Sequence, residues 1–89
     1  MSVYTDRVTL GTAATLIVPA FHNAQEVHLH NMTKSSNEYI FVGGSSVGTG
    51  NALHIDPGED LSFYLPPGDS IYAVSDPSGL DVGVLVLRK

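Results

Sequence analysis

The fold of this 89-residue chain is decided by its central stretch, which reads Glu38-Tyr-Ile-Phe-Val-Gly-Gly44, the small-residue segment 45–51, Ala52-Leu-His-Ile55, Asp56-Pro-Gly58-Glu59 and Asp60-Leu-Ser-Phe-Tyr-Leu65. Runs of β-branched and aromatic residues alternate there with residues that permit tight turns. Proline and glycine at the two central positions of a four-residue turn are typical of type II. The stretch therefore predicts three strands joined by turns.

The same pattern continues on both sides of this stretch. In the segment 25–32, Val27 and Leu29 alternate with polar residues, which predicts a half-buried strand that pairs as a hairpin with the strand 38–42. The apolar segment 81–88 predicts a central strand buried on both faces. Further strands are expected at 3–10, 15–18 and 70–75, with turns at Pro66-Pro-Gly-Asp69 and Asp76-Pro-Ser-Gly79.

Seven to eight short strands and no helix predict an all-β chain, an antiparallel β-sandwich. Jelly-roll and immunoglobulin-like topologies both fit this strand count. The length favours one domain over residues 1–89, in which residues 1–7 could instead extend as an N-terminal arm.

Composition limits the functions that this chain can have. Charged residues make up only 15% of it, and nine acidic against four basic residues give a net charge of −5, which disfavours nucleic-acid binding. No apolar run approaches the roughly 20 residues that span a membrane, and the first residues lack the order of a signal peptide, so we expect synthesis in a cytoplasm. With no cysteine, a chain this small gains robustness from oligomerisation rather than from disulfides.

Histidines form the first candidate for chemistry. His28 and His30 share one face of a strand, as the first two ligands of cupin-like metal sites do, and His54 could be imagined as a third. Glu38 follows His30 by eight residues, however, which is too far for that pattern. The alternative is a strand face that is polar because the opposite face is core, and we assign no metal ligand.

Acidic and hydroxyl residues give no catalytic constellation. Asp56, Glu59 and Asp60 crowd one turn, where an aspartate before Pro-Gly serves the turn's own hydrogen bonds. Ser45 and Ser46 have no histidine nearby in sequence to activate them. We therefore expect no enzyme, no catalytic residue and no cofactor.

Aromatic residues leave a further alternative open. Tyr39, Phe41, Phe63, Tyr64 and Tyr72 could form a platform on which a glycan stacks, or they could pack between strands. Because both faces of the strand around Phe41 are apolar, part of this surface is expected to be covered by another protein chain.

The order of these motifs resembles the small β-sandwich virion proteins of tailed bacteriophages, namely the capsid decoration (cement) and head-fibre-type proteins. The resemblance covers residues 8–87, and it is carried by Val27-His-Leu-His-Asn31, Tyr39-Ile-Phe-Val-Gly-Gly44, Asn51-Ala-Leu53, Asp56-Pro-Gly-Glu59, Ser70-Ile-Tyr-Ala73 and Val82-Gly-Val-Leu-Val86.

This resemblance implies a non-enzymatic virion protein that stabilises the capsid from its outer surface. The implied partners are the major capsid protein and further copies of the chain, as a homo-oligomer with a trimer favoured, and no nucleic acid or membrane. The alternatives from the residues are a tail or fibre accessory domain that binds a host-surface glycan and a cupin-like metal-binding barrel.

Overall fold

The computed structural model describes residues 2–50 and 53–88, which form eight β-strands and no helix. None of these residues belongs to a helix that could cross a membrane. The predicted all-β fold class is therefore confirmed. The strands are β1 (Ser2–Thr9), β2 (Thr15–Val18), β3 (Gln25–Asn31), β4 (Tyr39–Gly43), β5 (Leu53–Ile55), β6 (Asp60–Leu65), β7 (Ile71–Asp76) and β8 (Asp81–Arg88).

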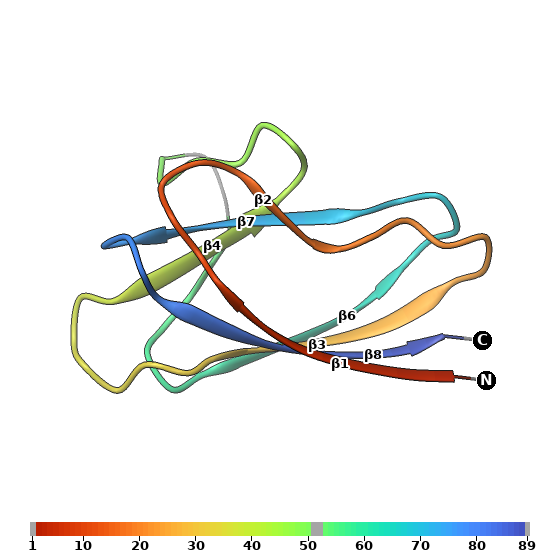
Figure 1. Cartoon of the computed structure of the whole chain (residues 1–89), viewed down its shortest axis with the longest axis horizontal. Helices are drawn as coiled ribbons and strands as arrows, with labels where there is room; N and C mark the ends of the chain where they lie inside the picture. Colours follow the sequence, from red (N-terminus) through yellow and green to blue (C-terminus); the bar gives the residue numbers. More distant parts are fainter. Residues whose placement is uncertain (1, 51–52, 89) are drawn as a thin grey trace.

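The strands form two antiparallel four-stranded sheets that pack face to face (Figure 1). Sheet A has the order β1-β8-β3-β6, and sheet B has the order β2-β7-β4-β5. The first strand therefore pairs with the last, the second with the seventh, the third with the sixth and the fourth with the fifth. This nested pairing is that of a jelly roll, so the structure decides between the two topologies that the sequence left open.

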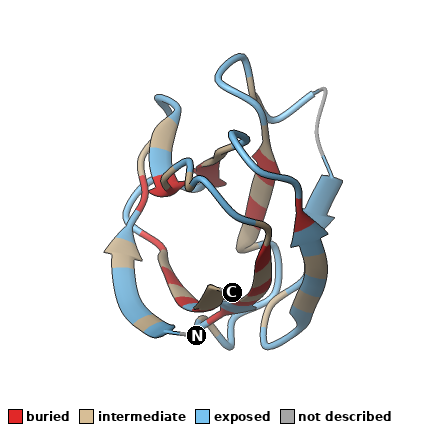
Figure 2. Ribbon diagram, turned by 90° about the vertical axis from the view of Figure 1, so that its right-hand side faces the viewer, coloured by how far each residue is buried: buried red, intermediate tan, exposed pale blue. Residues whose placement is uncertain are grey.

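Alternation along the strands places one face of each sheet in the core (Figure 2). In β3, Val27 and Leu29 are buried while Glu26 and His28 face outward. The core between the sheets consists of aliphatic side chains. Its buried members are Leu10, Ile17, Val18, Val27, Leu29, Ile40, Val42, Ile55, Leu65, Ala73, Leu80, Val82, Val84 and Val86.

Two sequence expectations are wrong, one about strand pairing and one about burial. Strands β3 and β4 are not a hairpin, because β3 pairs with β6 and β8 in sheet A while β4 pairs with β5 and β7 in sheet B. The segment 32–38 instead crosses from one sheet to the other. Strand β8 is central as predicted, but only its inward residues are fully buried, and Leu85 on the outer face is 38% exposed.

The N-terminal segment is an edge strand of sheet A rather than an arm. Each residue of β1 pairs with one in β8, from Ser2 opposite Arg88 to Thr9 opposite Asp81. The expected strand at 52–55 is seen as β5, and its first residue, Ala52, lies outside the described residues.

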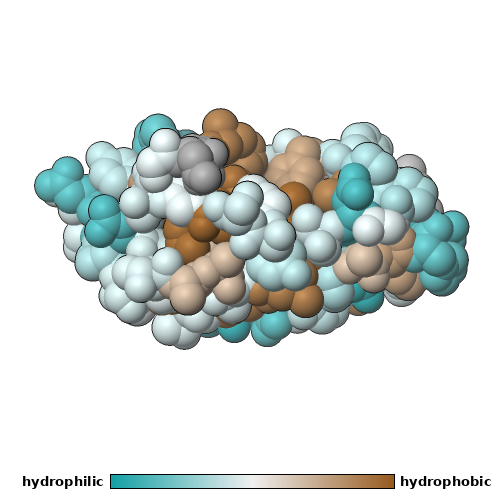
Figure 3. All heavy atoms as spheres, turned by 90° about the horizontal axis from the view of Figure 1, so that it is seen from above, coloured by the Kyte–Doolittle hydropathy of each residue, from teal (hydrophilic) through white to brown (hydrophobic). Residues whose placement is uncertain are grey.

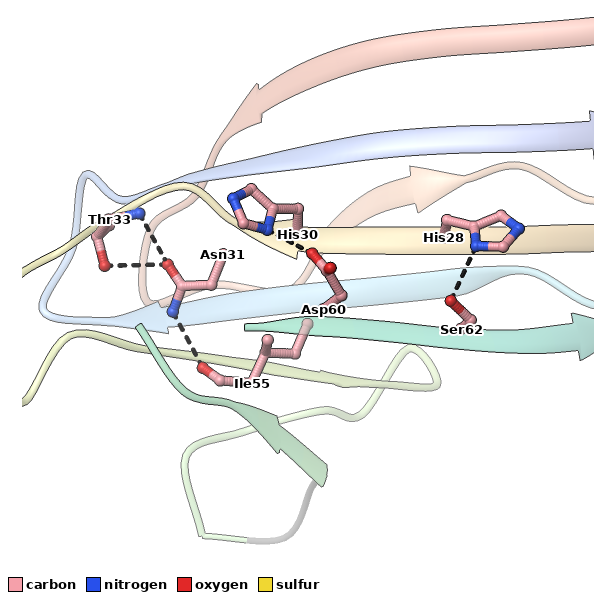
Figure 4. A network of polar contacts seen from close by, with 7 residues as sticks. All are labelled: His28, His30, Asn31, Thr33, Ile55, Asp60 and Ser62. Carbon is pink, nitrogen blue, oxygen red and sulfur yellow. Dashed lines mark hydrogen bonds and ion pairs between the residues drawn. The ribbon is translucent and has the colours of Figure 1, made fainter. Parts of the chain in front are cut away.

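The side chain of Asn31, at the end of β3, joins the two sheets (Figure 4). It is fully buried, and its amide nitrogen donates to the carbonyl oxygens of Ile55 at 3.0 Å and Glu38 at 2.9 Å. Its amide oxygen accepts from the backbone nitrogen of Thr33 at 3.1 Å and from the Thr33 hydroxyl at 3.0 Å. All four hydrogen-bonding positions of this amide are therefore used.

Two further buried polar side chains join strands to crossing loops. Gln25 donates to the carbonyl oxygen of Pro19 at 3.1 Å and accepts from Arg88 Nε at 3.0 Å. The Ser75 hydroxyl lies 2.8 Å from the carbonyl oxygen of Pro77 and 3.3 Å from that of Leu10. Among the described residues, every buried side-chain nitrogen and oxygen has a hydrogen-bond partner. Buried polar groups thus fix the loop crossings without leaving desolvation costs.

Replacing Asn31 with alanine is expected to lower the free energy of unfolding by about 2–3 kcal/mol, because the carbonyl groups of Glu38 and Ile55 lose their buried donor. The matched control is Thr33→Val, which removes only the hydroxyl donor and should cost about 1 kcal/mol or less. Urea denaturation measures both variants, and equal effects of the two would contradict the role given to the Asn31 amide.

Candidate functional site

The outer face of sheet A carries exposed apolar side chains beside polar ones. The β-strand register places them in rows across the sheet. The row nearest the chain termini contains Val3, Leu87, Glu26 and Tyr64. The second row contains Thr5, Leu85, His28 and Ser62. Val3 and Tyr64 are 63% and 64% exposed, values high for large hydrophobic side chains.

A third row creates an open groove on this face. It contains Arg7, Gly83, His30 and Asp60, so the missing side chain of Gly83 leaves a hollow between its neighbours. The groove has a volume of about 560 Å³, and the side chain of Met32, which lines it, lies 3.5 Å from the position that a Gly83 Cβ would take. Its lining combines apolar groups with imidazole, hydroxyl and carboxylate groups.

The histidines of this face are held by neighbouring side chains (Figure 4). His30 Nδ1 lies 2.5 Å from Asp60 Oδ1. His28 Nδ1 lies 2.8 Å from the Ser62 hydroxyl, and His28 Nε2 lies 2.7 Å from Glu26 Oε2. Sequence spacing missed the contacts with Asp60 and Ser62 because β3 and β6 are partners only in the folded sheet.

The contacts of His28 join a serine, a histidine and a carboxylate, but they do not make a hydrolytic site. In serine hydrolases the serine contacts Nε2 and the carboxylate contacts Nδ1, the reverse of the arrangement at His28. Arg7, the cation that lines the groove, is bound to Asp81 and lies on the edge strand β1, whereas Ser62 lies on β6 at the opposite edge of the sheet, too far for Arg7 to stabilise an oxyanion there. These contacts fix the orientation of the imidazole.

The three histidines considered for a metal site lie on two different sheets. His28 and His30 are on β3, whereas His54 is on β5 of sheet B, where its Nε2 lies 3.1 Å from Asp56 Oδ1. Within residues 2–50 and 53–88, no group of three histidine, aspartate or glutamate side chains is placed to hold a metal ion.

The acidic residues of the central turn also separate. Asp56 turns to His54 on sheet B, while Asp60 turns to His30 on sheet A. The turn itself is made by the backbone, because Glu59 N donates to Asp56 O at 3.0 Å and Gly58 has a φ of 76°. A hydrogen-bonding role in the turn therefore accounts for the backbone of Asp56 but not for its carboxylate.

The five aromatic residues do not form one platform. Phe63 packs against the core and Tyr64 faces outward on sheet A. Tyr39 and Phe41 alternate with buried residues of β4 and so lie on the outer face of sheet B, where Tyr72 of β7 is also found. Figure 3 shows that hydrophobic side chains form separate patches on the side of the molecule that carries sheet B.

A second, smaller hollow of about 340 Å³ lies on sheet B, lined by Tyr39, Phe41, His54 and Asp56. The Tyr39 and His54 rings meet edge to face, with centroids 5.5 Å apart and an interplanar angle of 82°. The Phe41 ring lies 5.9 Å from that of His54. The described part of the chain thus offers two open surface hollows of different chemistry, one on each sheet.

Strand β1 is fastened to β8 by a charged contact on the outer face. Asp81 accepts from the Thr9 hydroxyl at 2.6 Å and from Arg7 Nε at 2.7 Å. The hydrogen bond from Thr9, followed by that from Arg7, lowers the pKa of the Asp81 carboxyl from its ordinary value of 3.8. The ionised carboxylate therefore stabilises the edge of the sheet that borders the groove.

Comparison with known proteins gives a likeness of fold. No protein-family model matches the sequence, and no curated protein matches it. A solved structure of Bacillus endospore appendages, described as a novel family of disulfide-linked pili, has a TM-score of 0.54 and 16% sequence identity to this chain. The match covers 96% of this chain and 83% of that one. At this identity the likeness concerns the fold alone.

Asp81→Asn is expected to destabilise the protein at neutral pH. Because the pKa of Asp81 is lowered in the folded state, its stabilising effect is present above the unfolded value and is lost as the pH falls through the folded one. The difference in unfolding free energy between wild type and variant should therefore shrink below about pH 3.8.

Urea denaturation between pH 7 and pH 2 measures this difference, with Asp69→Asn in the exposed 66–69 turn as the control. A gap between Asp81→Asn and wild type that stayed constant throughout would argue against the ionised carboxylate as its source.

Proposed function

We propose that this chain is a non-enzymatic structural subunit of a large protein assembly, and specifically that it decorates the capsid of a tailed bacteriophage. The outer face of sheet A contacts neighbouring subunits in this proposal. The observation that carries it is the set of exposed apolar side chains on that face, Val3, Met32, Tyr64 and Leu85, around an open groove.

The distribution of exposed hydrophobic residues supports this choice of face. Of the six large hydrophobic side chains that are exposed in the described residues, three lie on strands of sheet A, Met32 directly follows β3 and lines the groove, and the other two are Leu16 and Leu53. Apolar side chains gathered on one face of a small protein are typical of a contact surface rather than of random surface composition. Polar contacts such as that between His30 and Asp60 rim these residues, as in protein interfaces generally.

The shape of the face gives the contact its specificity. The groove at Gly83 is about 560 Å³ and open, so a protruding segment of a neighbouring subunit can enter it. Gly83 lies in the centre of the sheet, between the β1 and β3 residues Arg7 and His30, so the groove floor is rigid backbone. A second copy of the chain or the major capsid protein would supply the entering segment.

The similar solved structure belongs to an assembly, which agrees with the proposal, but the likeness itself is one of fold. The similar structure comes from appendages described as disulfide-linked pili. The present sequence contains no cysteine, so in this proposal its copies associate through contacts other than disulfides. Many weak contacts repeated on a lattice add up through multivalency, which is the mechanism that capsid decoration requires.

The capsid as the place of action rests on the sequence resemblance. In that setting each copy would bridge adjacent capsid subunits, and a homo-oligomer, a trimer by the same resemblance, would multiply the contacts. Bridging raises the free energy needed to open the shell locally, because several interfaces must then break together. The protein would then be found on the surface of the virion.

Leu85→Glu is expected to abolish self-association and binding to capsids, because it places a charge in the centre of the proposed interface. Because Leu85 is 38% exposed in the subunit, an interface buries only that part of its side chain, which is worth about 0.6–1.1 kcal/mol, and the larger loss comes from burying an unpaired carboxylate. The matched control is Leu16→Glu on the outer face of sheet B, since the two leucines are 38% and 46% exposed.

Light scattering over a dilution series measures self-association, and co-sedimentation with empty capsids measures binding. Equal loss in both variants would indicate that sheet A has no special role. A wild-type protein that is monomeric at all concentrations and does not sediment with capsids would remove the proposal. Self-association without capsid binding would retain the structural role and reject the capsid.

Gly83→Ala is expected to weaken the same association while leaving the monomer folded. A Cβ at this position would lie 3.5 Å from Met32 Sδ and 3.7 Å from His30 Cβ, which are ordinary contact distances. The added methyl group raises the groove floor and excludes part of the entering segment. Unchanged association at an unchanged melting temperature would show that the groove stays empty in the assembly.

A further inference from the structure

We infer that the hollow on sheet B is a binding site for a neutral saccharide unit, which the assembled protein presents on its outward side. The site consists of Tyr39 and Phe41 on β4, His54 on β5, and Asp56 directly after β5. It lies on the sheet opposite the proposed assembly interface, so sugar binding does not depend on that proposal, whereas display on the outward side rests on it.

The fold brings these four side chains together from two neighbouring strands. Tyr39 and Phe41 alternate with buried residues of β4, so both rings face outward. The antiparallel register places His54 opposite Phe41, and Asp56, two residues further, lies on the same side. Strand β5 is the edge of sheet B, which leaves the hollow open to a ligand from the side.

The hollow is anchored to the rest of the protein by the Asn31 network. Ile55, between His54 and Asp56, accepts a hydrogen bond from the Asn31 amide at 3.0 Å. The following turn is fixed because Gly58 N donates to the Asn31 carbonyl oxygen at 3.1 Å. A three-residue edge strand is thus held at its carboxyl end by buried hydrogen bonds. Such support from buried neighbours is what a preorganised site needs.

The chemistry of the lining fits a sugar ring. The Tyr39 and Phe41 rings offer apolar surface to the C–H face of a pyranose, and they are only partly buried. Asp56 and His54, 3.1 Å apart, have side chains 59% and 54% exposed. A carboxylate accepts hydrogen bonds from sugar hydroxyls, and an imidazole nitrogen can donate to or accept from a neighbouring hydroxyl.

Charge and size narrow the ligand class. The carboxylate and the negative faces of the rings oppose an anionic ligand. A quaternary ammonium ion has no hydrogen-bonding groups, so it would leave the hydrogen-bonding groups of His54 and Asp56 unused. The volume of about 340 Å³ lies near the lower limit of ligand pockets, about 300–1,000 Å³. A single terminal sugar residue suits this space better than a longer chain.

In a repeated assembly, this arrangement would allow many weak sugar sites to bind together. One small open site of this kind binds a single sugar weakly, but many copies on one particle would bind a glycan-covered surface through multivalency. With sheet A turned to its neighbours, sheet B faces outward and its hollows are displayed together.

The test is an NMR titration of the isotope-labelled protein with methyl glycosides of glucose, galactose, mannose and N-acetylglucosamine, each at millimolar concentration. At least one of them should shift the resonances of Tyr39, Phe41 and His54. Asp56→Asn should weaken that binding about tenfold through loss of a charge-assisted hydrogen bond, and Tyr39→Ala should abolish it.

The matched control for the carboxylate is Asp60→Asn, since Asp60 forms the corresponding pair with His30 on sheet A without aromatic walls. Tyr64→Ala is the control for the tyrosine. Both should bind the glycoside as the wild type does. If Tyr39→Ala fails to fold, Asp56→Asn and His54→Gln still test the site, because both side chains are more than half exposed.

Three results would overturn the inference: no shift with any glycoside, equal weakening by Asp56→Asn and Asp60→Asn, or shifts at the hollow with tetramethylammonium but with no sugar. Repeating the titration on Leu85→Glu, which is expected to be monomeric, separates this result from the assembly proposal. Sugar binding by that variant would support the hollow whatever the assembly state.

Discussion

The buried amide of Asn31 is the interaction on which the arrangement of the two sheets depends. A jelly roll moves the chain repeatedly from one sheet to the other, and at each crossing backbone carbonyl groups leave their strand partners inside the protein. Asn31, in sheet A, donates to the carbonyl groups of Glu38 and Ile55 on the side of sheet B. Gln25 and Ser75 do the same for other crossings. An apolar residue at these positions would fill the space but leave those carbonyl groups unsatisfied.

Because these hydrogen bonds lie inside the protein, the outer faces of the two sheets can differ in their side chains. Since the aliphatic core and three polar side chains hold the sheets together, many outward residues of the strands are not constrained by core packing. On sheet A these positions hold apolar residues beside paired charges, with Gly83 hollowing the centre. On sheet B they hold Tyr39, Phe41 and His54. Two separate surfaces with two chemistries are what a subunit needs if it joins neighbours with one side and displays the other.

The sequence predicted strands and turns well because those depend on neighbouring residues. Alternation marked β3, and glycines at positive φ closed the turns at Gly58 and Gly68. Pairing depends on residues far apart, and nothing in the segment 32–38 shows that it crosses between sheets, so a hairpin was predicted wrongly. The side-chain contacts of the candidate sites could not be predicted from the sequence for the same reason. His30 has its carboxylate 30 positions away at Asp60, and the partner of Arg7 is 74 positions away. Only the alternation of Tyr39 and Phe41 hinted at the sheet B hollow.

The low charge of the chain is in keeping with the roles proposed for the two faces. The structure describes three of the four lysine and arginine residues. Arg7 binds Asp81, and Arg88 lies over the Tyr4 and Phe21 rings. Lys34 is exposed in the crossing segment. The basic groups beside the faces are thus engaged within the subunit, where they close the edge and the end of the sandwich. In the proposed assembly, association through sheet A would therefore rely on apolar burial and shape rather than on complementary charges. Such a contact survives physiological salt, which screens exposed charges beyond about 8 Å but leaves hydrophobic burial intact.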